Sequence, residues 1–151
     1  MGDREATLAV TEEIAPDDEA AIRTRLLDYN NTTLLGPTDR RNLAILLRDT
    51  DGNVDGGLVG YTGRGWLYVQ MLFVPERLRG QGIAGQLLKS AEDEAIARGC
   101  RGAYIDTINP VACRAYERAG YQVFGRIENF SNGLDICWLI KRFAETADPQ
   151  A

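Results

Sequence analysis

The feature that most constrains the fold of this chain is a glycine-rich junction at residues 74–85, VPERLRGQGIAG. An apolar run, WLYVQMLFV, precedes it, and IAGQLLKSAEDEAIARG follows it with apolar residues at helical spacing. The first pattern predicts a strand and the second an amphipathic helix that ends at Gly99. The sequence therefore predicts a strand, a glycine loop and a helix in succession, an arrangement that exposes unpaired backbone N–H groups at the start of the helix.

Regular patterns on both sides of the junction predict further strands and helices. Those expected before it are a strand at TLAVTEEI, a helix from Pro16 toward Tyr29, an irregular connection through DYNNTTLLGPTDRR, and a hairpin of LAILLRD and VDGGLVGYT around Asp51-Gly52. Those expected after it are a strand at AYIDTI, a short helix from Asn109-Pro110 to Gly120, and two strands, YQVFGRIENF and LDICWLIKRF, around Ser131-Asn132-Gly133.

This order predicts an α+β fold. The first strands form an antiparallel meander, and one βαβ crossover lies in the middle of the chain. With 151 residues the chain has the length of a single domain, and we expect residues 1–151 to form one, ordered over about residues 6–143.

Composition excludes several classes of function. The chain has no histidine, which rules out Ser-His-Asp and Cys-His catalysis and argues against a metal site. Its net charge of −5 argues against a nucleic-acid partner and mildly favours a cationic small substrate. No apolar run approaches the roughly 20 residues that cross a bilayer. Three widely spaced cysteines without a CxxC pair are typical of reduced thiols, so we expect a cytoplasmic protein with no membrane partner.

The spacing of Gly80, Gly82 and Gly85 matches GxGxxG, the dinucleotide-binding fingerprint. In that fold the strand runs directly into the first glycine, and several βα units follow. Here five residues, PERLR, intervene, and only two or three strands remain. A phosphate-binding P-loop also fails, because no Gly-Lys-Ser/Thr closes the segment. Two interpretations stay open: a tight turn, or N–H groups of Gly80, Gly82, Ile83 and Ala84 that hold an anionic group between Arg77 and Arg79.

Two motifs together resemble the GNAT superfamily of N-acetyltransferases, which use acetyl-CoA. The family signature Gln/Arg-x-x-Gly-x-Gly/Ala fits RLRGQG at residues 77–82, and the preceding LFVPE resembles the strand end that binds pantetheine. The helix at residues 112–121, ACRAYERAGY, resembles the second signature, in which an Asn precedes a Tyr and a Gly-aromatic pair closes the helix. The order of elements over about residues 6–143 agrees. The resemblance implies a mostly antiparallel sheet of six to seven strands, splayed at the cofactor site and flanked by about four helices.

The resemblance also implies roles for particular residues. The backbone of Leu72, Phe73 and Val74 would pair with the pantetheine arm, and Asn109 would bond the same region. Tyr116 would protonate the departing thiolate. The pyrophosphate would be held by Arg79, Gly80, Gln81, Gly82, Ile83 and Ala84.

The general base is left unassigned by the sequence. Many family members carry a Glu on the strand before the cofactor, whereas here that strand offers Trp66, Tyr68, Gln70 and Leu72. Asp106 and Glu128 are both candidates for acting through water. The expected acceptor is a primary amine of a small molecule. A non-catalytic acyl-CoA-binding domain and a protein N-acetyltransferase remain alternatives, and a homodimer is left open.

Overall fold

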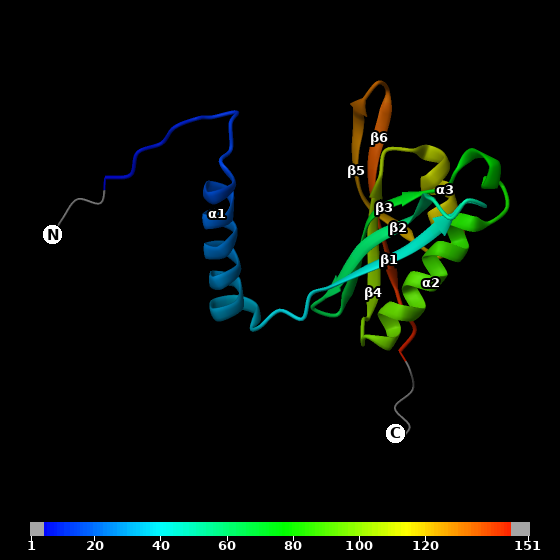
Figure 1. Ribbon diagram of the computed structural model, residues 1–151, viewed down its shortest axis with the longest axis horizontal. Helices are drawn as coiled ribbons and strands as arrows, with labels where there is room; N and C mark the ends of the chain where they lie inside the picture. Colours follow the sequence, from blue (N-terminus) through cyan, green and yellow to red (C-terminus); the bar gives the residue numbers. More distant parts are fainter. Residues whose placement is uncertain (1–4, 146–151) are drawn as a thin grey trace, which may run out of the picture. The chain divides into compact units, whose positions relative to one another are not determined.

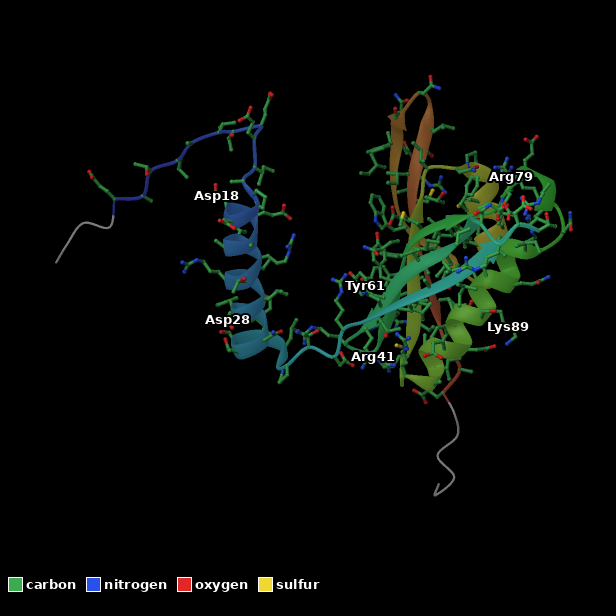
Figure 2. The ribbon with its side chains drawn as sticks, in the orientation of Figure 1. Asp18, Asp28, Arg41, Tyr61, Arg79 and Lys89 are labelled. Atoms are coloured by element: carbon green, nitrogen blue, oxygen red, sulfur yellow. The ribbon has the colours of Figure 1, made fainter. Side chains whose placement is uncertain are left out.

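The computed structural model describes residues 5–145, which divide into two compact units, one ending at Thr38 and the other beginning at Asp39. The first unit contains helix α1 (Pro16–Tyr29), which Pro16 begins and whose first turn carries Asp17, Asp18 and Glu19. Acidic residues at this end stabilise a helix, because its unpaired N–H groups carry partial positive charge. Asp18 near the start and Asp28 near the end of α1 are labelled in Figure 2.

Two sequence predictions for this unit are wrong. Residues 7–14 form no strand, and the side chains of Leu8 and Val10 are 98% and 103% exposed. Alternating apolar residues make a strand only where a second strand pairs with them, and the described part of this unit has none. The expected irregular connection contains a π-helix, Asn30–Leu35, that continues α1. The chain stays helical there until Gly36, whose φ of 73° ends it.

The second unit is built on a six-stranded mixed sheet, drawn in Figure 1. Its strands lie in the order β1-β2-β3-β4-β6-β5, and only β3 and β4 are parallel. This confirms the predicted α+β class with a single parallel crossover. The strands are β1 (Arg41–Arg48), β2 (Val54–Gly63), β3 (Trp66–Phe73), β4 (Gly102–Thr107), β5 (Gln122–Ser131) and β6 (Leu134–Arg142).

Two helices, α2 (Ile83–Ala97) and α3 (Pro110–Arg118), cover one face of the sheet, as Figure 1 shows. A 3-10 turn (Glu76–Leu78) precedes α2. The inward residues of the strands alternate with outward ones, so a single apolar core forms under the helices. Fully buried members of this core are Leu58, Leu67, Val69, Leu88, Ala91, Ala95, Ala103 and Leu139.

The centre of the sheet departs from regular pairing in two ways. The β2–β3 register shifts between Val59 and Gly60, which leaves Gln70 as an extra residue in β3. A Cβ at Gly60 would lie 2.1 Å from the carbonyl oxygen of Tyr68, so the close approach of the strands requires glycine there. In addition, β3–β4 pairing ends at Val69 and Ile105, although both strands continue. The two central strands therefore separate beyond this point.

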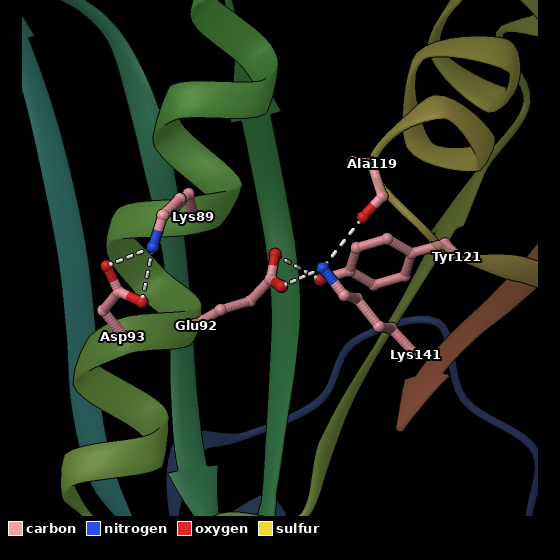
Figure 3. A network of polar contacts seen from close by, with 6 residues as sticks. All are labelled: Lys89, Glu92, Asp93, Ala119, Tyr121 and Lys141. Carbon is pink, nitrogen blue, oxygen red and sulfur yellow. Dashed lines mark hydrogen bonds and ion pairs between the residues drawn. The ribbon is translucent and has the colours of Figure 1, made fainter. Parts of the chain in front are cut away.

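A buried polar network joins the helices to the sheet (Figure 3). Glu92 on α2 is 6% exposed, and its carboxylate lies 2.5 Å from Nζ of Lys141 on β6. The same ammonium donates to the carbonyl oxygen of Ala119 at the end of α3, at 2.8 Å, and the Tyr121 hydroxyl donates to Glu92 at 3.5 Å. These contacts offset part of the cost of burying the Glu92 carboxylate and link α2, α3 and β6.

Candidate active site

A cavity of about 380 Å³ opens where β3 and β4 separate. Its walls come from the ends of these strands, from α3 and from the β5–β6 hairpin. The lining residues are Gln70, Met71, Leu72, Phe73, Ile105, Asp106, Thr107, Ile108, Tyr116, Phe130 and Ile136. Three residues to which the family resemblance assigned a role, Leu72, Phe73 and Tyr116, therefore meet at one place, together with Asp106, a candidate base.

Leu72 and Phe73 pair with Leu58 and Gly57 of β2 on one side only. Because β3–β4 pairing has already ended, the other edge of these two residues faces the cavity instead of a strand. An extended ligand can pair with such an edge through main-chain hydrogen bonds. Val74 follows directly and is partly buried against the core. Its carbonyl oxygen accepts a hydrogen bond from Nε of Arg79 at 3.0 Å.

The glycine loop forms the N-terminus of α2, as predicted. Gly82 is the N-cap residue with φ of 75°, and Gly80 has φ of 73°. The first turn of α2, which Ile83 and Ala84 begin, has no acidic residue and no side-chain cap, so its N–H groups remain open to an anion. Gln81 does not point into this space with its amide nitrogen, which donates to the carbonyl oxygen of Arg77 at 3.0 Å.

The two arginines before the glycines differ in their surroundings. Arg77 forms an ion pair with Asp55 of β2 and so ties the 3-10 turn to the sheet. Arg79 is exposed and lies beside the start of α2, well separated from Lys89 in the middle of the helix (Figure 2). Of the two, Arg79 is the one whose position suits contact with a bound anion.

Tyr116 is 4% exposed on the inner face of α3, yet it lines the cavity. Burial, with the nearby Asp106 and Cys113 adding to it, raises the pKa of Tyr116 to about 12. Its hydroxyl has no hydrogen-bond partner among residues 5–145. A buried tyrosine usually has one, so this hydroxyl is available to a ligand in the cavity.

Asn109 is placed differently from the other predicted residues. It is the N-cap of α3, and its side-chain oxygen accepts from the backbone N–H of Val111 at 2.9 Å. It does not line the cavity at the separated strands, although its neighbours Thr107 and Ile108 do. The cap geometry explains why an Asn stands here, and a contact with the cofactor stays a prediction.

Asp106 and Tyr68 form a pair whose importance the sequence did not reveal. The Tyr68 hydroxyl donates to Oδ1 of Asp106 at 2.9 Å, across the parallel strands β3 and β4. Burial and the hydrogen bond to Asp106 raise the pKa of Tyr68 to about 12. Of the two carboxylates considered as a base, Asp106 lines the cavity and Glu128 does not. Tyr68 and Asp106 are 38 residues apart in the sequence, so only the parallel pairing of β3 with β4 could have revealed their contact.

A second hollow, of about 400 Å³, lies between α3 and the β5–β6 hairpin. It contains an ion pair of Arg126 and Asp135 at 3.1 Å and two buried thiols, Cys113 and Cys137. All three cysteines of the chain are free. No group of metal-binding side chains occurs among residues 5–145, and no helix in that range is long and apolar enough to span a membrane.

A separated pair of central strands, a tyrosine in the gap and a glycine-capped helix beside it together define an acyl-transfer fold. The chain belongs to the acetyltransferase (GNAT) family, whose profile matches residues 8–121. Enzymes of this family use acetyl-CoA. The chain is therefore an acetyltransferase, as the two motifs predicted.

Similar proteins agree with this assignment. Acetyltransferase Atu2258 of Agrobacterium fabrum is 57% identical over 125 residues, which are 83% of this chain and 90% of that protein. A solved acetyltransferase structure from Agrobacterium tumefaciens is 51% identical, with a TM-score of 0.87 over 91% of this chain and all of that one. Blasticidin-S acetyltransferase of Streptomyces morookaense is 34% identical over 91 residues, 60% of this chain and 67% of that protein.

Proposed function

We propose that this acetyltransferase transfers the acetyl group of acetyl-CoA directly to a primary amine of a small molecule. The observation that carries the proposal is the cavity between β3 and β4, where an unpaired strand edge and the Tyr116 hydroxyl meet. The similarity to blasticidin-S acetyltransferase, which is named for a small molecule, supports the class of acceptor.

The cofactor is expected to lie along the open edge of β3. Leu72, Phe73 and Val74 would hold the pantetheine arm, with Asn109 nearby. The pyrophosphate would rest on the start of α2, held by the N–H groups of Gly80, Gln81, Gly82, Ile83 and Ala84 and by the Arg79 side chain. The positive end of the helix and the cation both favour a bound anion at this position.

The transfer itself needs no covalent intermediate on the protein. The neutral amine attacks the thioester carbonyl, a C–N bond forms, and the C–S bond breaks. A backbone N–H near Leu72, at the bulge in β3, would stabilise the oxyanion. Tyr116 would give its proton to the departing sulfur, because its raised pKa keeps it protonated throughout the physiological range.

A screen of thiol release tests the proposal. The protein is incubated with acetyl-CoA and a panel of amino sugars, polyamines, amino acids, aromatic amines and aminoglycosides, and free CoA is followed over time. We expect amine-dependent release with at least one of them. Tight binding of acetyl-CoA by calorimetry without any amine-dependent release would favour the non-catalytic acyl-CoA-binding domain instead. Acetylation of peptide N-termini alone would favour the protein N-acetyltransferase.

A further inference from the structure

Among residues 5–145, those that line the cavity between β3 and β4 supply one carboxylate and no cationic side chain. Among its lining residues Asp106 is the only one with a charged side chain. Two arginines that pack on nearby aromatic rings lie elsewhere: Arg40 over the Tyr61 ring at 3.8 Å and Arg142 over the Trp66 ring at 5.3 Å. Neither lines the cavity. A ligand there meets one negative charge with no compensating positive charge.

Asp106 and Tyr116 approach the cavity from opposite faces of the sheet. Ile105 is buried under the helices, so the next residue, Asp106, projects from the other face. Tyr116 lies on α3, which covers the first face. The cavity therefore passes between the strands, with the proposed acid at one side and a carboxylate at the other.

The carboxylate of Asp106 is held in a fixed position by an aromatic row. Tyr68 donates to Oδ1 and stacks on Tyr104 with 4.8 Å between ring centroids, while Tyr61 packs edge-on against Tyr68 at 5.6 Å. Tyr61 projects from the side of the sheet away from α2 (Figure 2). Oδ2 of Asp106 accepts no hydrogen bond from residues 5–145, so it can accept one from an ammonium ion.

We propose that Asp106 binds the acceptor as a cation and receives the proton that its nitrogen loses, and that the acceptor is an amine without a neighbouring carboxylate. This inference rests on the proposed function and extends it to the acceptor class. An α-amino acid would bring a second carboxylate close to Asp106 in a cavity without a cation. At the separations of an active site, two like charges repel by enough to change affinity about tenfold or more.

The proton steps balance with these two residues. The bound ammonium ion first gives one proton to Asp106, which releases it to solvent, and the neutral amine then attacks the thioester carbonyl. As the C–N bond forms, the nitrogen becomes positively charged and its proton strongly acidic, so the regenerated carboxylate suffices to accept it. The C–S bond then breaks, and Tyr116 protonates the sulfur. The proton on Asp106 passes through the cavity or through solvent to the Tyr116 phenolate, which restores both groups. The products are the amide, CoA thiol and one proton released to solvent, and no oxidation state changes.

Matched pairs of acceptors that differ by one carboxylate test the substrate class. The full-length protein is assayed by thiol release with tyramine and tyrosine, tryptamine and tryptophan, and cadaverine and lysine. In each pair that reacts, we expect kcat/KM for the decarboxylated amine to exceed that for the amino acid by at least about tenfold. Equal use of both members of a pair, or preference for the amino acid, would overturn the inference.

Three variants test the residue assignment. Asp106→Asn should lower kcat/KM about 100-fold, within the usual range for a positioned base, without weakening acetyl-CoA binding. Asp135→Asn, which removes a carboxylate from the second hollow, should leave turnover unchanged. Tyr68→Phe should lower turnover in the wild-type background and have no further effect in Asp106→Asn, because Tyr68 is a positioning residue that acts through that carboxylate.

Failure of this inference can be distinguished from failure of the proposed function. Unchanged turnover in a folded Asp106→Asn variant, or an effect of Tyr68→Phe that persists in the Asp106→Asn background, overturns the assignment of Asp106 while amine acetylation stands. If calorimetry shows acetyl-CoA binding but no amine or amino acid is acetylated, the proposed function is wrong, and this inference falls with it.

Discussion

The position of Tyr116 is compatible with two roles, packing in the core and catalysis. It is buried on the inner face of α3, yet its hydroxyl reaches a cavity and has no partner among the described residues. Tyr116→Phe keeps the ring and removes only the hydroxyl. We expect kcat to fall about 100-fold, at the lower end of the range for a positioned acid, because a thiolate is already a good leaving group. Acetyl-CoA affinity, measured by calorimetry, should be unchanged.

The neighbouring Tyr121 provides the matched control. Its ring centroid lies 6.4 Å from that of Tyr116, and it is also buried, but its hydroxyl donates to Glu92 instead of facing the cavity. Tyr121→Phe should therefore lower the melting temperature and leave kcat unchanged. If the Tyr116→Phe variant instead lost stability and kept a normal kcat, Tyr116 would be a core tyrosine without a catalytic role.

The buried pair of Glu92 and Lys141 is expected to matter for stability only. Lys141→Met would leave the Glu92 carboxylate, 6% exposed, with only a long hydrogen bond from Tyr121. Removing one partner of a buried ion pair typically lowers the free energy of unfolding by about 3–5 kcal/mol. We expect a decrease of about 3 kcal/mol here, because Lys141 is partly exposed.

Urea unfolding measures this loss, and the double variant Glu92→Leu with Lys141→Met is the control. With both charges removed, much of the loss should be recovered. A single Lys141→Met variant as stable as the wild type would mean that the pair contributes little.

At the scale of elements, a substitution at the start of α2 tests whether the pyrophosphate of acetyl-CoA binds there. Gly82→Asp places a carboxylate at the helix N-terminus, where the proposed pyrophosphate would lie, and forces a residue with a Cβ to adopt φ of 75°. We expect acetyl-CoA binding to be lost, as measured by calorimetry. Ser90→Asp adds the same charge on the exposed surface of α2 away from its start, and it should bind acetyl-CoA as the wild type does.

Most elements could be predicted from the sequence because their signals are local. The β1–β2 hairpin, α2 and α3 were predicted from turn glycines, from the Asn109 cap and from apolar periodicity. The errors lie where the decisive interaction is not local. Residues 7–14 alternate like a strand but have no partner strand within their unit. Nothing in residues 30–35 breaks the helix, so α1 continues as a π-helix.

The candidate site also has one part that local sequence signals predict and another that depends on non-local pairing. The glycine loop is a contiguous motif, and its position at the start of α2 followed from the sequence. The contact of Tyr68 with Asp106 depends on the register of two parallel strands joined by a long crossover. From the sequence, Asp106 and Glu128 were equivalent candidates for the general base. Only the structure distinguishes them, because Asp106 lines the cavity and Glu128 does not.

At the scale of the whole molecule, buried tyrosines make stability depend on alkaline pH. Burial, and for Tyr121 the nearby Glu92, raises the pKa of Tyr116 to about 12 and the pKa of Tyr121 further still. In the unfolded chain a tyrosine has a pKa of about 10. Above that pH the unfolded chain releases these two protons while the folded protein keeps them, so the unfolded state binds fewer protons.

The free energy of unfolding should therefore be unaffected by these groups below about pH 9 and decrease between about pH 10 and 12. Each of the two tyrosines contributes a slope of up to about 1.4 kcal/mol per pH unit in this window. Urea unfolding at a series of pH values measures the slope, and Tyr116→Phe and Tyr121→Phe are the comparisons. Because each variant lacks one titrating group, its slope should be shallower than that of the wild type, whatever its stability at neutral pH.

Slopes parallel to the wild type would mean that these hydroxyls ionise equally easily in the folded and unfolded chain. In that case Tyr116 would also lose its proton near pH 10, and kcat should fall there. With the raised pKa, kcat should show no decrease from Tyr116 up to about pH 10.5.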